Sequence, residues 1–405
     1  MREIDSFWQE PWSARTRFAP HQWLPIPVKR GPPSVMTSTQ RLPASLTPLD
    51  VALAALLRGL EPVKAIALPL REALGCVTAE MPPLKAIPTH EVAAADGFAL
   101  RARDLVGASS YTPLPLVNAP VWVEAGDRIP VGCDCVVDAD AVEQAGSITQ
   151  VLAEVIPGQG VRRVGGEIAE GFATAPGVRF RPLDGLVAQA AGLEEIWVRR
   201  PRVRIVNIPA TAGESALLVR ESASAAGADV VAVDATSRDA AAIAETLDTT
   251  SGDLLITVGG SGVGRTDATI AALAQCGEVV AHGIALQPGH TTAIGRVRHT
   301  PVIALSGAPD RALGAWWSLA LPVLDRLSGR QLRQTLTLPL ARKIASSVGI
   351  AEIVLLARDG DAWMPLAVGD LPLQAVARAD AWLAVLGGSE GFAAGTPVDA
   401  YMLRE

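Results

Sequence analysis

Apolar residues near the start of the chain recur every three to four positions between residues 47 and 60. This spacing places them on one face of a helix, so it predicts a helix over residues 47–60. Thr47 is expected to cap that helix and Pro48 to lie in its first turn, where an N–H has no partner anyway. Residues 1–45 carry three tryptophans and no such period, so we expect an irregular amino-terminal extension or an arm that docks a partner.

The pattern changes to short alternating runs, punctuated by Pro and Gly, between residues 66 and 197. Such runs predict strands, including those at 121–123, 135–137 and 148–155. We therefore expect residues 46–198 to form helical and β-rich amino-terminal domains.

After residue 199 apolar strands alternate with helical stretches. Strands are expected at 203–208, 230–233, 254–258 and 302–305, and helices at 214–225, 237–248, 266–275 and 310–327. This alternation implies a doubly wound parallel sheet, so residues 199–330 are expected to be a central α/β domain. Residues 331–405 return to strand-like runs, which predicts a small carboxyl-terminal β domain with strands at 336–338, 350–356, 382–386 and 397–403.

The composition narrows the function classes. A chain of 405 residues is too long for one core, and its net charge of −7 argues against general nucleic-acid binding, although a local cationic pocket is compatible with it. The longest apolar runs fall short of the roughly 20 residues of a membrane span, and the start of the chain lacks a secretory pattern. The four cysteines fit neither a disulfide framework nor a zinc site. We expect a cytoplasmic protein with no nucleic-acid or membrane partner.

The most informative segment is the glycine loop, residues 259–267, which follows the apolar run 254–258. Backbone N–H groups of glycines at the mouth of a helix bind phosphate or a similar anion. Asp267, at the end of this loop, would repel an anion unless a metal ion lies between them.

Three other interpretations of the glycine loop compete. A dinucleotide fingerprint fails because Arg265 stands where the last glycine is required. A P-loop is closer, but Arg265 replaces its lysine and Asp267 would face the phosphates. The third interpretation is a plain tight turn, with Asp267 capping the following helix.

A second acidic motif, Asp96-Gly97, is by itself typical of a hairpin turn. Together with the glycine loop, however, the motif order resembles that of the molybdopterin molybdenumtransferases, the family that includes the E domain of gephyrin. The resemblance runs from about residue 45 to the carboxyl terminus. Residues 94–99 resemble the family's S-A-M-D-G-Y-A, residues 161–168 resemble R-R-x-G-E-D-I, and the glycine loop resembles G-G-V-S-x-G-x-x-D.

The resemblance implies an elongated subunit of four domains that forms a homodimer, with a central molybdopterin-binding domain and a barrel-like carboxyl-terminal domain. It implies that adenylylated molybdopterin and molybdate are the substrates and Mg²⁺ the cofactor. The implied reaction inserts molybdenum into the dithiolene and releases AMP. Other molybdenum-cofactor proteins or molybdoenzymes are implied as further partners.

The resemblance also implies the residues of the site. The carboxylates for catalysis are Asp96, Glu167, Glu214 and Asp267, and of these Asp267 and Glu214 are expected to hold the metal. The residues expected to bind the cofactor are Gly259, Gly260, Ser261, Gly262, Gly264, Arg162, Arg163, Pro288, Gly289, His290, Gly307 and Pro309. The two arginines suit oxyanions because a guanidinium presents a fork of donors.

Several positions depart from the family's pattern. Its K-P-G-K becomes Gln287-Pro288-Gly289-His290, which removes two fixed cations, and its L-P-G-N-P becomes a segment with Ala308 in place of the amide. Hydrogen bonds to charged groups contribute roughly 1.5–3 kcal/mol against about 1 kcal/mol for neutral ones. Losing both cations therefore weakens anion binding by roughly ten- to a thousandfold unless other groups compensate.

Three functions stay open on the sequence. The first is a divergent molybdenumtransferase. The second is a paralogue that binds or delivers molybdopterin without catalysis, and the third is an enzyme acting on a related nucleotide or pterin anion. The residues at positions 287, 290 and 308 distinguish the transferase from the non-catalytic paralogue, because they replace polar or charged groups of the family's pattern.

Overall fold

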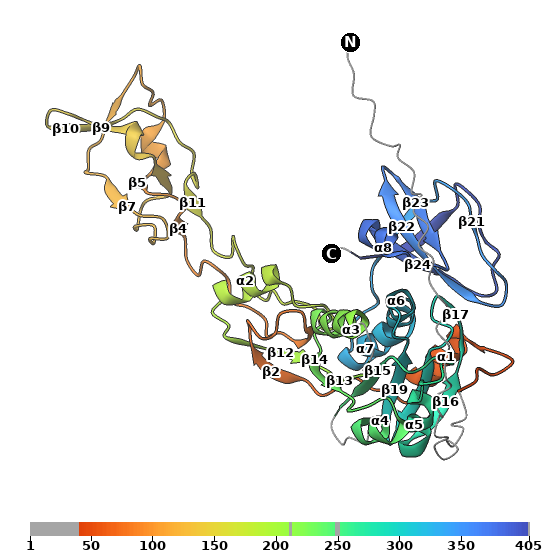
Figure 1. Ribbon diagram of the computed structural model, residues 1–405. Helices are drawn as coiled ribbons and strands as arrows, with labels where there is room; N and C mark the ends of the chain where they lie inside the picture. The colour runs from red at the N-terminus through yellow and green to blue at the C-terminus, as the bar shows by residue number, and fades with distance from the viewer. Residues whose placement is uncertain (1–39, 210–212, 248–251, 404–405) are drawn as a thin grey trace, which may run out of the picture. The chain divides into compact units, whose positions relative to one another are not determined.

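The computed structural model describes residues 40–209, 213–247 and 252–403 (Figure 1). The expectations for residues 1–39, including the three amino-terminal tryptophans, lie outside the described residues.

The first helix, α1 (Leu49–Leu57), is shorter than expected at both ends. Thr47 and Pro48 form a short strand, β1 (Thr47–Pro48), which pairs in parallel with β17 (Ile284–Gln287). Thr47 therefore does not cap α1, and the predicted cap is wrong. Pro48 is the residue before the helix, and its extended backbone (ψ 142°) serves the strand instead.

The β-rich region between residues 66 and 197 is confirmed as small antiparallel sheets. One joins β2 (Ile66–Pro69), β12 (Glu195–Arg199) and β3 (Val77–Glu80). Another joins β7 (Val121–Val123), β5 (Gly97–Leu100) and β8 (Cys135–Val137). The remaining strands are β6 (Leu114–Pro115), β10 (Ile148–Val151), β9 (Val142–Ala145), β4 (Val92–Ala93) and β11 (Val161–Arg162). The helix α2 (Pro182–Ala190) was not predicted.

The central sheet has the order β14-β13-β15-β19-β18-β16. The four predicted strands are parallel to one another: β14 (Asp229–Asp234), β13 (Arg202–Asn207), β15 (Leu254–Val258) and β19 (Thr300–Leu305). Two further strands, β18 (Ala293–Val297) and β16 (Glu278–His282), were not predicted. β18 is antiparallel to both of its neighbours, β19 and β16, and β16 lies at the edge of the sheet. The sheet is therefore mixed, because a connection of two residues between β18 and β19 permits only antiparallel pairing.

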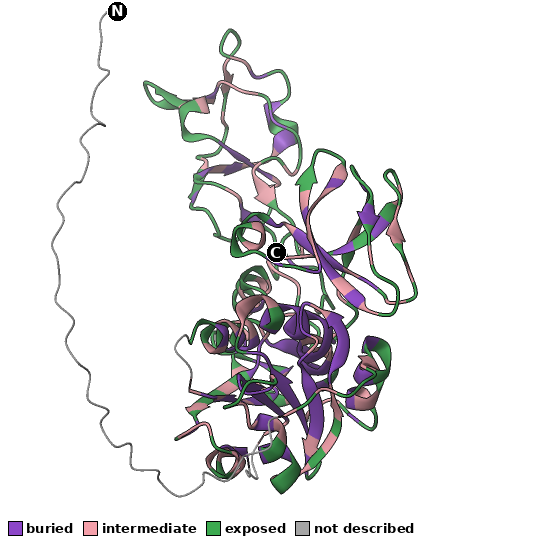
Figure 2. Cartoon of the chain, turned by 45° about the vertical axis from the view of Figure 1, so that its right-hand side comes forward, coloured by how far each residue is buried: buried purple, intermediate pink, exposed green. Residues whose placement is uncertain are grey.

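Helices cover both faces of the central sheet. Alternate residues of β13 and β15 pack against α1, α3 (Glu214–Ala225), α6 (Pro309–Ala315) and α7 (Leu321–Ser328) on one face. Val206, Leu255 and Val302 face α4 (Ala240–Leu247) and α5 (Thr269–Cys276) on the other. The inner strands β15, β18 and β19 are buried along nearly their whole length, and Figure 2 shows the buried core of this domain in purple. Burial on both faces is what makes these strands continuous apolar runs.

The helix expected over residues 310–327 is interrupted. Between α6 and α7 the chain forms a π-helical turn, η3 (Trp316–Ala320). Pro322 lies in the first turn of α7 and has no N–H to continue the hydrogen-bond ladder, which favours a widened turn before it.

The carboxyl-terminal β region is confirmed. Its sheet follows the path β1-β17-β22-β24-β26-β20, with β23 beside β22. The added strands are β20 (Thr335–Pro339), β22 (Ala351–Asp359), β23 (Ala362–Val368), β24 (Ala381–Val385) and β26 (Pro397–Met402), and one helix, α8 (Leu373–Arg378), lies among them. Two strand segments from earlier in the chain, β1 and β17, thus complete a sheet that the sequence assigned to residues 331–405 alone.

Candidate functional site

The carboxyl ends of the four parallel strands meet at one edge of the central sheet. Ligands of open α/β sheets bind outside this edge, where successive connections leave in opposite directions. Here β13 lies between β14 and β15, so the connections diverge next to β15. The glycine loop follows β15 and the turn Ser306–Gly307 follows β19, which brings both to this edge.

A cavity of about 470 Å³ opens there, and we call it the loop pocket. Of the residues predicted from the sequence, it brings together Gly259, Gly260, Gly262, Gly264, Asp267, His290 and Gly307. The other lining residues were not predicted from the sequence: Arg238, Val263, Thr291, Ser306 and Arg311.

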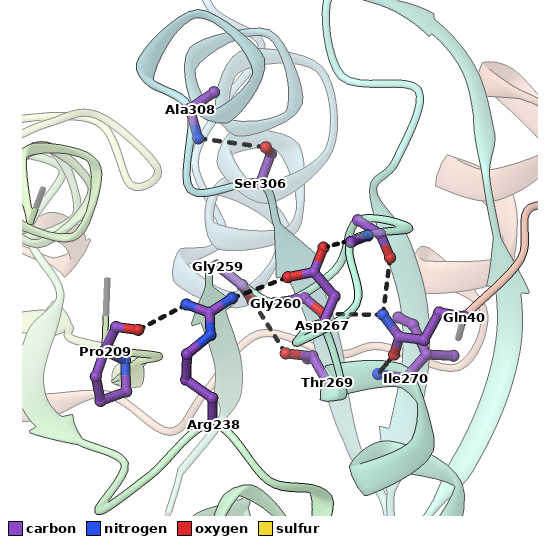
Figure 3. A network of polar contacts seen from close by, with 12 residues as sticks. Gln40, Pro209, Arg238, Gly259, Gly260, Asp267, Thr269, Ile270, Ser306 and Ala308 are labelled. Carbon is purple, nitrogen blue, oxygen red and sulfur yellow. Dashed lines mark hydrogen bonds and ion pairs between the residues drawn. The ribbon is translucent and has the colours of Figure 1, made fainter. Parts of the chain in front are cut away.

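Asp267 is held by two groups inside the loop pocket (Figure 3). Its Oδ1 accepts a hydrogen bond from Nη2 of Arg238 at 2.9 Å, and its Oδ2 accepts one from the N–H of Gly264 at 2.9 Å. The helix α5 begins at Thr269, with Ala268 before it and no side-chain cap. The interpretation of Asp267 as a helix cap is therefore wrong: its carboxylate folds back on its own loop.

Part of the glycine loop's backbone is already engaged. The N–H of Gly259 donates to the carbonyl oxygen of Leu305 at 2.9 Å, and that of Gly264 donates to Asp267. These two N–H groups are therefore not available to an anion. Gly259 and Gly260 have φ of 97° and 68°, values that suit glycine and turn the chain back over the end of β15.

The side chain of Gln40 forms hydrogen bonds with the same loop. Its Nε2 donates to the carbonyl oxygens of Gly260 at 3.0 Å and Gly262 at 2.8 Å, and its Oε1 accepts from the N–H of Ile270 at 2.7 Å (Figure 3). Thr269 adds two bonds, from its N–H to Gly260 and from its hydroxyl to Gly259. The loop is thus fixed before any ligand arrives.

His290 lines the loop pocket as a neutral group near pH 7. Burial lowers the pKa of its imidazole below the ordinary 6.5, and the nearby charge of Arg311 lowers it further. The cation that the family's pattern places at this position is therefore absent, and Arg311 supplies a fixed positive charge beside it instead.

Hydroxyl groups complete the wall of the loop pocket. Thr291 Oγ1 is buried without a hydrogen-bond partner in the described structure. Ser306 Oγ accepts from the N–H of Ala308 at 3.3 Å, which leaves its own proton for another acceptor. Ser261 does not line the cavity; its side chain is fully buried and its carbonyl oxygen contacts Nε2 of His282 at 3.0 Å.

A second cavity, of about 320 Å³, gathers other predicted residues, and we call it the amino-terminal pocket. Arg162 and Glu167 line it and form an ion pair with each other. Asp96 accepts a hydrogen bond from the N–H of Ala125, a lining residue, at 2.8 Å. The site residues therefore fall into two groups, in two separate cavities of one chain.

The remaining predicted residues line neither cavity. Pro288 and Gly289 are buried ahead of His290, and Pro309 opens α6 beyond Gly307. Arg163 is exposed on the loop after β11. Glu214 is exposed at the first residue of α3; its neighbour Ser215 donates to the carbonyl oxygen of Gly307 at 2.8 Å.

Two of the missed residues carried a usable signal. Arg238 follows the end of β14 and Arg311 follows the end of β19 by a few residues. Polar residues just after parallel strands collect at the ligand edge. Neither arginine belongs to one of the recognised motifs, so neither was predicted as a site residue.

A magnesium ion on Asp267 does not fit the donors present. Mg²⁺ takes oxygen ligands in octahedral geometry, commonly one or two carboxylates together with substrate phosphates. Both oxygens of Asp267 already accept hydrogen bonds, one of them from a permanently charged guanidinium, and Glu214 does not line the loop pocket. Among the described residues no group of three or more His, Cys, Asp and Glu side chains is arranged to hold a metal.

Comparison with known proteins places this architecture in a family. Residues 210–326 match the family described as "Probable molybdopterin binding domain", and residues 47–192 match "MoeA N-terminal region (domain I and II)". The molybdopterin molybdenumtransferase of Synechococcus elongatus is 26% identical over 78% of this chain and 89% of its own length. Molybdopterin molybdenumtransferase 2 of Mycobacterium tuberculosis is 28% identical over 66% of this chain and 76% of its own.

The fold has solved relatives as well. The molybdopterin biosynthesis moeA protein from Pyrococcus horikoshii OT3 superposes with a TM-score of 0.65 at 22% identity, over 88% of this chain and all of that one. A molybdenum cofactor biosynthesis protein from Pyrococcus furiosus gives a TM-score of 0.54 at 18% identity, over 88% of this chain and 99% of that one. The chain is a divergent member of the molybdopterin molybdenumtransferase family.

Within the ranges that the structure describes, no helix combines the length and apolar character needed to cross a membrane.

Proposed function

We propose that this protein is a molybdopterin molybdenumtransferase: it binds adenylylated molybdopterin and molybdate, inserts molybdenum into the dithiolene and releases AMP. The observation that carries the proposal is the loop pocket. A glycine loop, two arginines and two hydroxyl residues meet at the ligand edge of a sheet whose sequence matches a molybdopterin-binding domain. These groups suit a ligand with several phosphoryl oxygens.

The chemistry assigned to the residues is binding and charge stabilisation. Arg238 and Arg311 offset the negative charge of the phosphates, and the hydroxyls of Thr291 and Ser306 orient their oxygens. Water adds to the adenylyl phosphorus as the P–O bond to the molybdopterin phosphate breaks, which gives AMP. Negative charge grows on the departing oxygen of the molybdopterin phosphate, and a fixed guanidinium stabilises it. No metal is assigned to Asp267, so the Mg²⁺ predicted from the sequence has no part in this step.

The amino-terminal pocket is assigned to the same reaction. Arg162, Glu167 and Asp96 provide one cation and two carboxylates around a second cavity.

We infer that the protein works as a homodimer in the cytoplasm. Its domains are proposed to span residues 46–198, residues 199–330 and a barrel-like region, residues 331–405. Family membership supports these proposals.

A second candidate function is a paralogue that binds or delivers molybdopterin without turnover. Two observations favour it: His290 is neutral where the family's pattern has a lysine, and Ala308 offers no side-chain amide. Binding then survives through the two arginines while turnover is lost.

The test separates these candidates. Purified protein is mixed with adenylylated molybdopterin and molybdate, and AMP is followed by chromatography. AMP release in step with molybdenum insertion is expected. Tight retention of the ligand without AMP would instead establish the binding paralogue, and failure to bind molybdopterin at all would reject both.

A further inference from the structure

The guanidinium of Arg238 lies against Asp267, the carboxylate that was predicted to hold a metal ion. It donates from Nη2 to Asp267 at 2.9 Å and from Nη1 to the carbonyl oxygen of Pro209 at 2.6 Å. The side chain of Arg238 is 32% exposed and that of Asp267 is 17% exposed, so the pair is shielded from much of the solvent. The two residues come from different connections at the same sheet edge, and both line the loop pocket.

We propose that Arg238 is the built-in cation of the loop pocket, and that the pocket binds its anionic group without a divalent metal on Asp267. The identity of the natural ligand rests on the proposed function; the assignment of the cation does not. In this arrangement Arg238 is a positioning and binding residue: it neutralises Asp267 and also presents positive charge to the ligand.

The donors of Arg238 allow both roles. A guanidinium has five N–H groups in a rigid fork. One bond goes to Asp267 and one to Pro209, which fixes the plane of the fork and leaves further N–H groups for an oxyanion.

The fixed charge of Arg238 also excludes a metal from Asp267. A guanidinium carries a fixed positive charge in proteins. A divalent ion at Asp267 would lie within a few ångströms of that guanidinium and be repelled by it. Displacing Arg238 would also break its bond to Pro209.

Molybdate is the probe for the test, because it is a small tetrahedral dianion. Its dissociation constant is measured by isothermal titration calorimetry with the full chain, once in excess EDTA and once in excess MgCl₂. For the unchanged protein we expect the two constants to agree within about twofold. For Arg238→Gln we expect binding at least about tenfold weaker in EDTA, with recovery in MgCl₂ because Asp267 is then free to hold the metal.

The double variant Arg238→Gln/Asp267→Asn separates neutralisation of Asp267 from direct contact with the anion. Without the carboxylate there is nothing for a metal to bind, so the constants in EDTA and MgCl₂ should agree again. Arg220→Gln is the matched control: Arg220 is an exposed arginine of the same central domain, paired with Glu221 on α3, and its loss should leave both constants unchanged. Melting temperatures of all variants check that they are folded.

Three results would overturn the proposal: molybdate binding by the unchanged protein only with Mg²⁺, unweakened binding by Arg238→Gln in EDTA, or no molybdate binding under either condition. The proposed function fails separately, through the absence of AMP release and of molybdopterin binding. A protein with metal-independent molybdate binding but no turnover would keep this inference and reject the enzyme.

Discussion

Gln40 is joined to Gly262 across 222 positions of sequence: its Nε2 donates to the glycine's carbonyl oxygen at 2.8 Å. The same side chain also holds Gly260 and the first turn of α5, so one residue fixes both the bend of the glycine loop and the helix that follows it. The loop pocket therefore depends on a residue that precedes the first helix of the chain.

Gln40→Ala should weaken molybdate binding and lower the melting temperature. Each neutral hydrogen bond contributes about 1 kcal/mol, and water can partly replace the bonds that the loop carbonyls lose. We therefore expect the free energy of unfolding to fall by about 1–2 kcal/mol. Calorimetry gives the affinity and differential scanning calorimetry the stability. Gln189→Ala, which removes an exposed glutamine on α2, should change neither quantity. An unchanged molybdate affinity in Gln40→Ala would show that the loop binds its anion without the hydrogen bonds of Gln40.

His290 should make the protein less stable in mild acid. Burial and Arg311 lower the pKa of the folded protein's imidazole below the unfolded value of 6.5, so the unfolded chain binds more protons in that window. His290 therefore costs no stability above pH 6.5, and stability is lost as the pH falls from 6.5 toward the folded pKa.

His290→Gln removes this titration. Urea unfolding curves measured from about pH 7 to about pH 5 should show a smaller fall in unfolding free energy for the variant than for the unchanged protein. Parallel profiles would mean that His290 has the same pKa in both states. His299→Gln is the matched control, because His299 lies in the turn between β18 and β19 and does not line the loop pocket.

His290→Lys should raise the affinity for molybdate by about tenfold, because a charge-assisted hydrogen bond replaces a neutral one. The new ammonium also lies near Arg311, so the melting temperature should fall slightly. Calorimetry and thermal unfolding measure the two effects. An unchanged affinity would show that the existing arginines already satisfy the anion.

Arg162→Ala should slow AMP release without unfolding the protein. The ion pair with Glu167 is about half exposed, and exposed pairs contribute about 0–1 kcal/mol to stability. AMP release should nonetheless fall by at least about tenfold if Arg162 contacts substrate. Arg103→Ala removes a more exposed arginine, paired with Asp104, and is expected to leave AMP release intact. Equal rates for the two variants would remove the amino-terminal pocket from the reaction.

Much of the central domain could be predicted because its signals are local. The strand β15 and the helix α3 have the predicted limits, since an apolar run between polar residues and a helical stretch after a glycine depend only on neighbouring positions. The predictions failed where distant residues decide the structure. Thr47 joins a strand because Ile284 lies beside it. β16 and β18 pair with each other although β17, a strand of another sheet, separates them in the sequence.

For the site, the sequence by itself determined the glycine loop, its acidic end and the family, because glycines that must adopt positive φ and residues in motif order are visible without coordinates. Only the tertiary structure decided what Asp267 binds. Arg238 is 29 residues away in sequence and belongs to another connection. The two residues meet because the parallel strands β14 and β15 end at the same edge of the sheet. The same packing buries His290 beside Arg311 and keeps it neutral, a matter of solvent exclusion that no motif records.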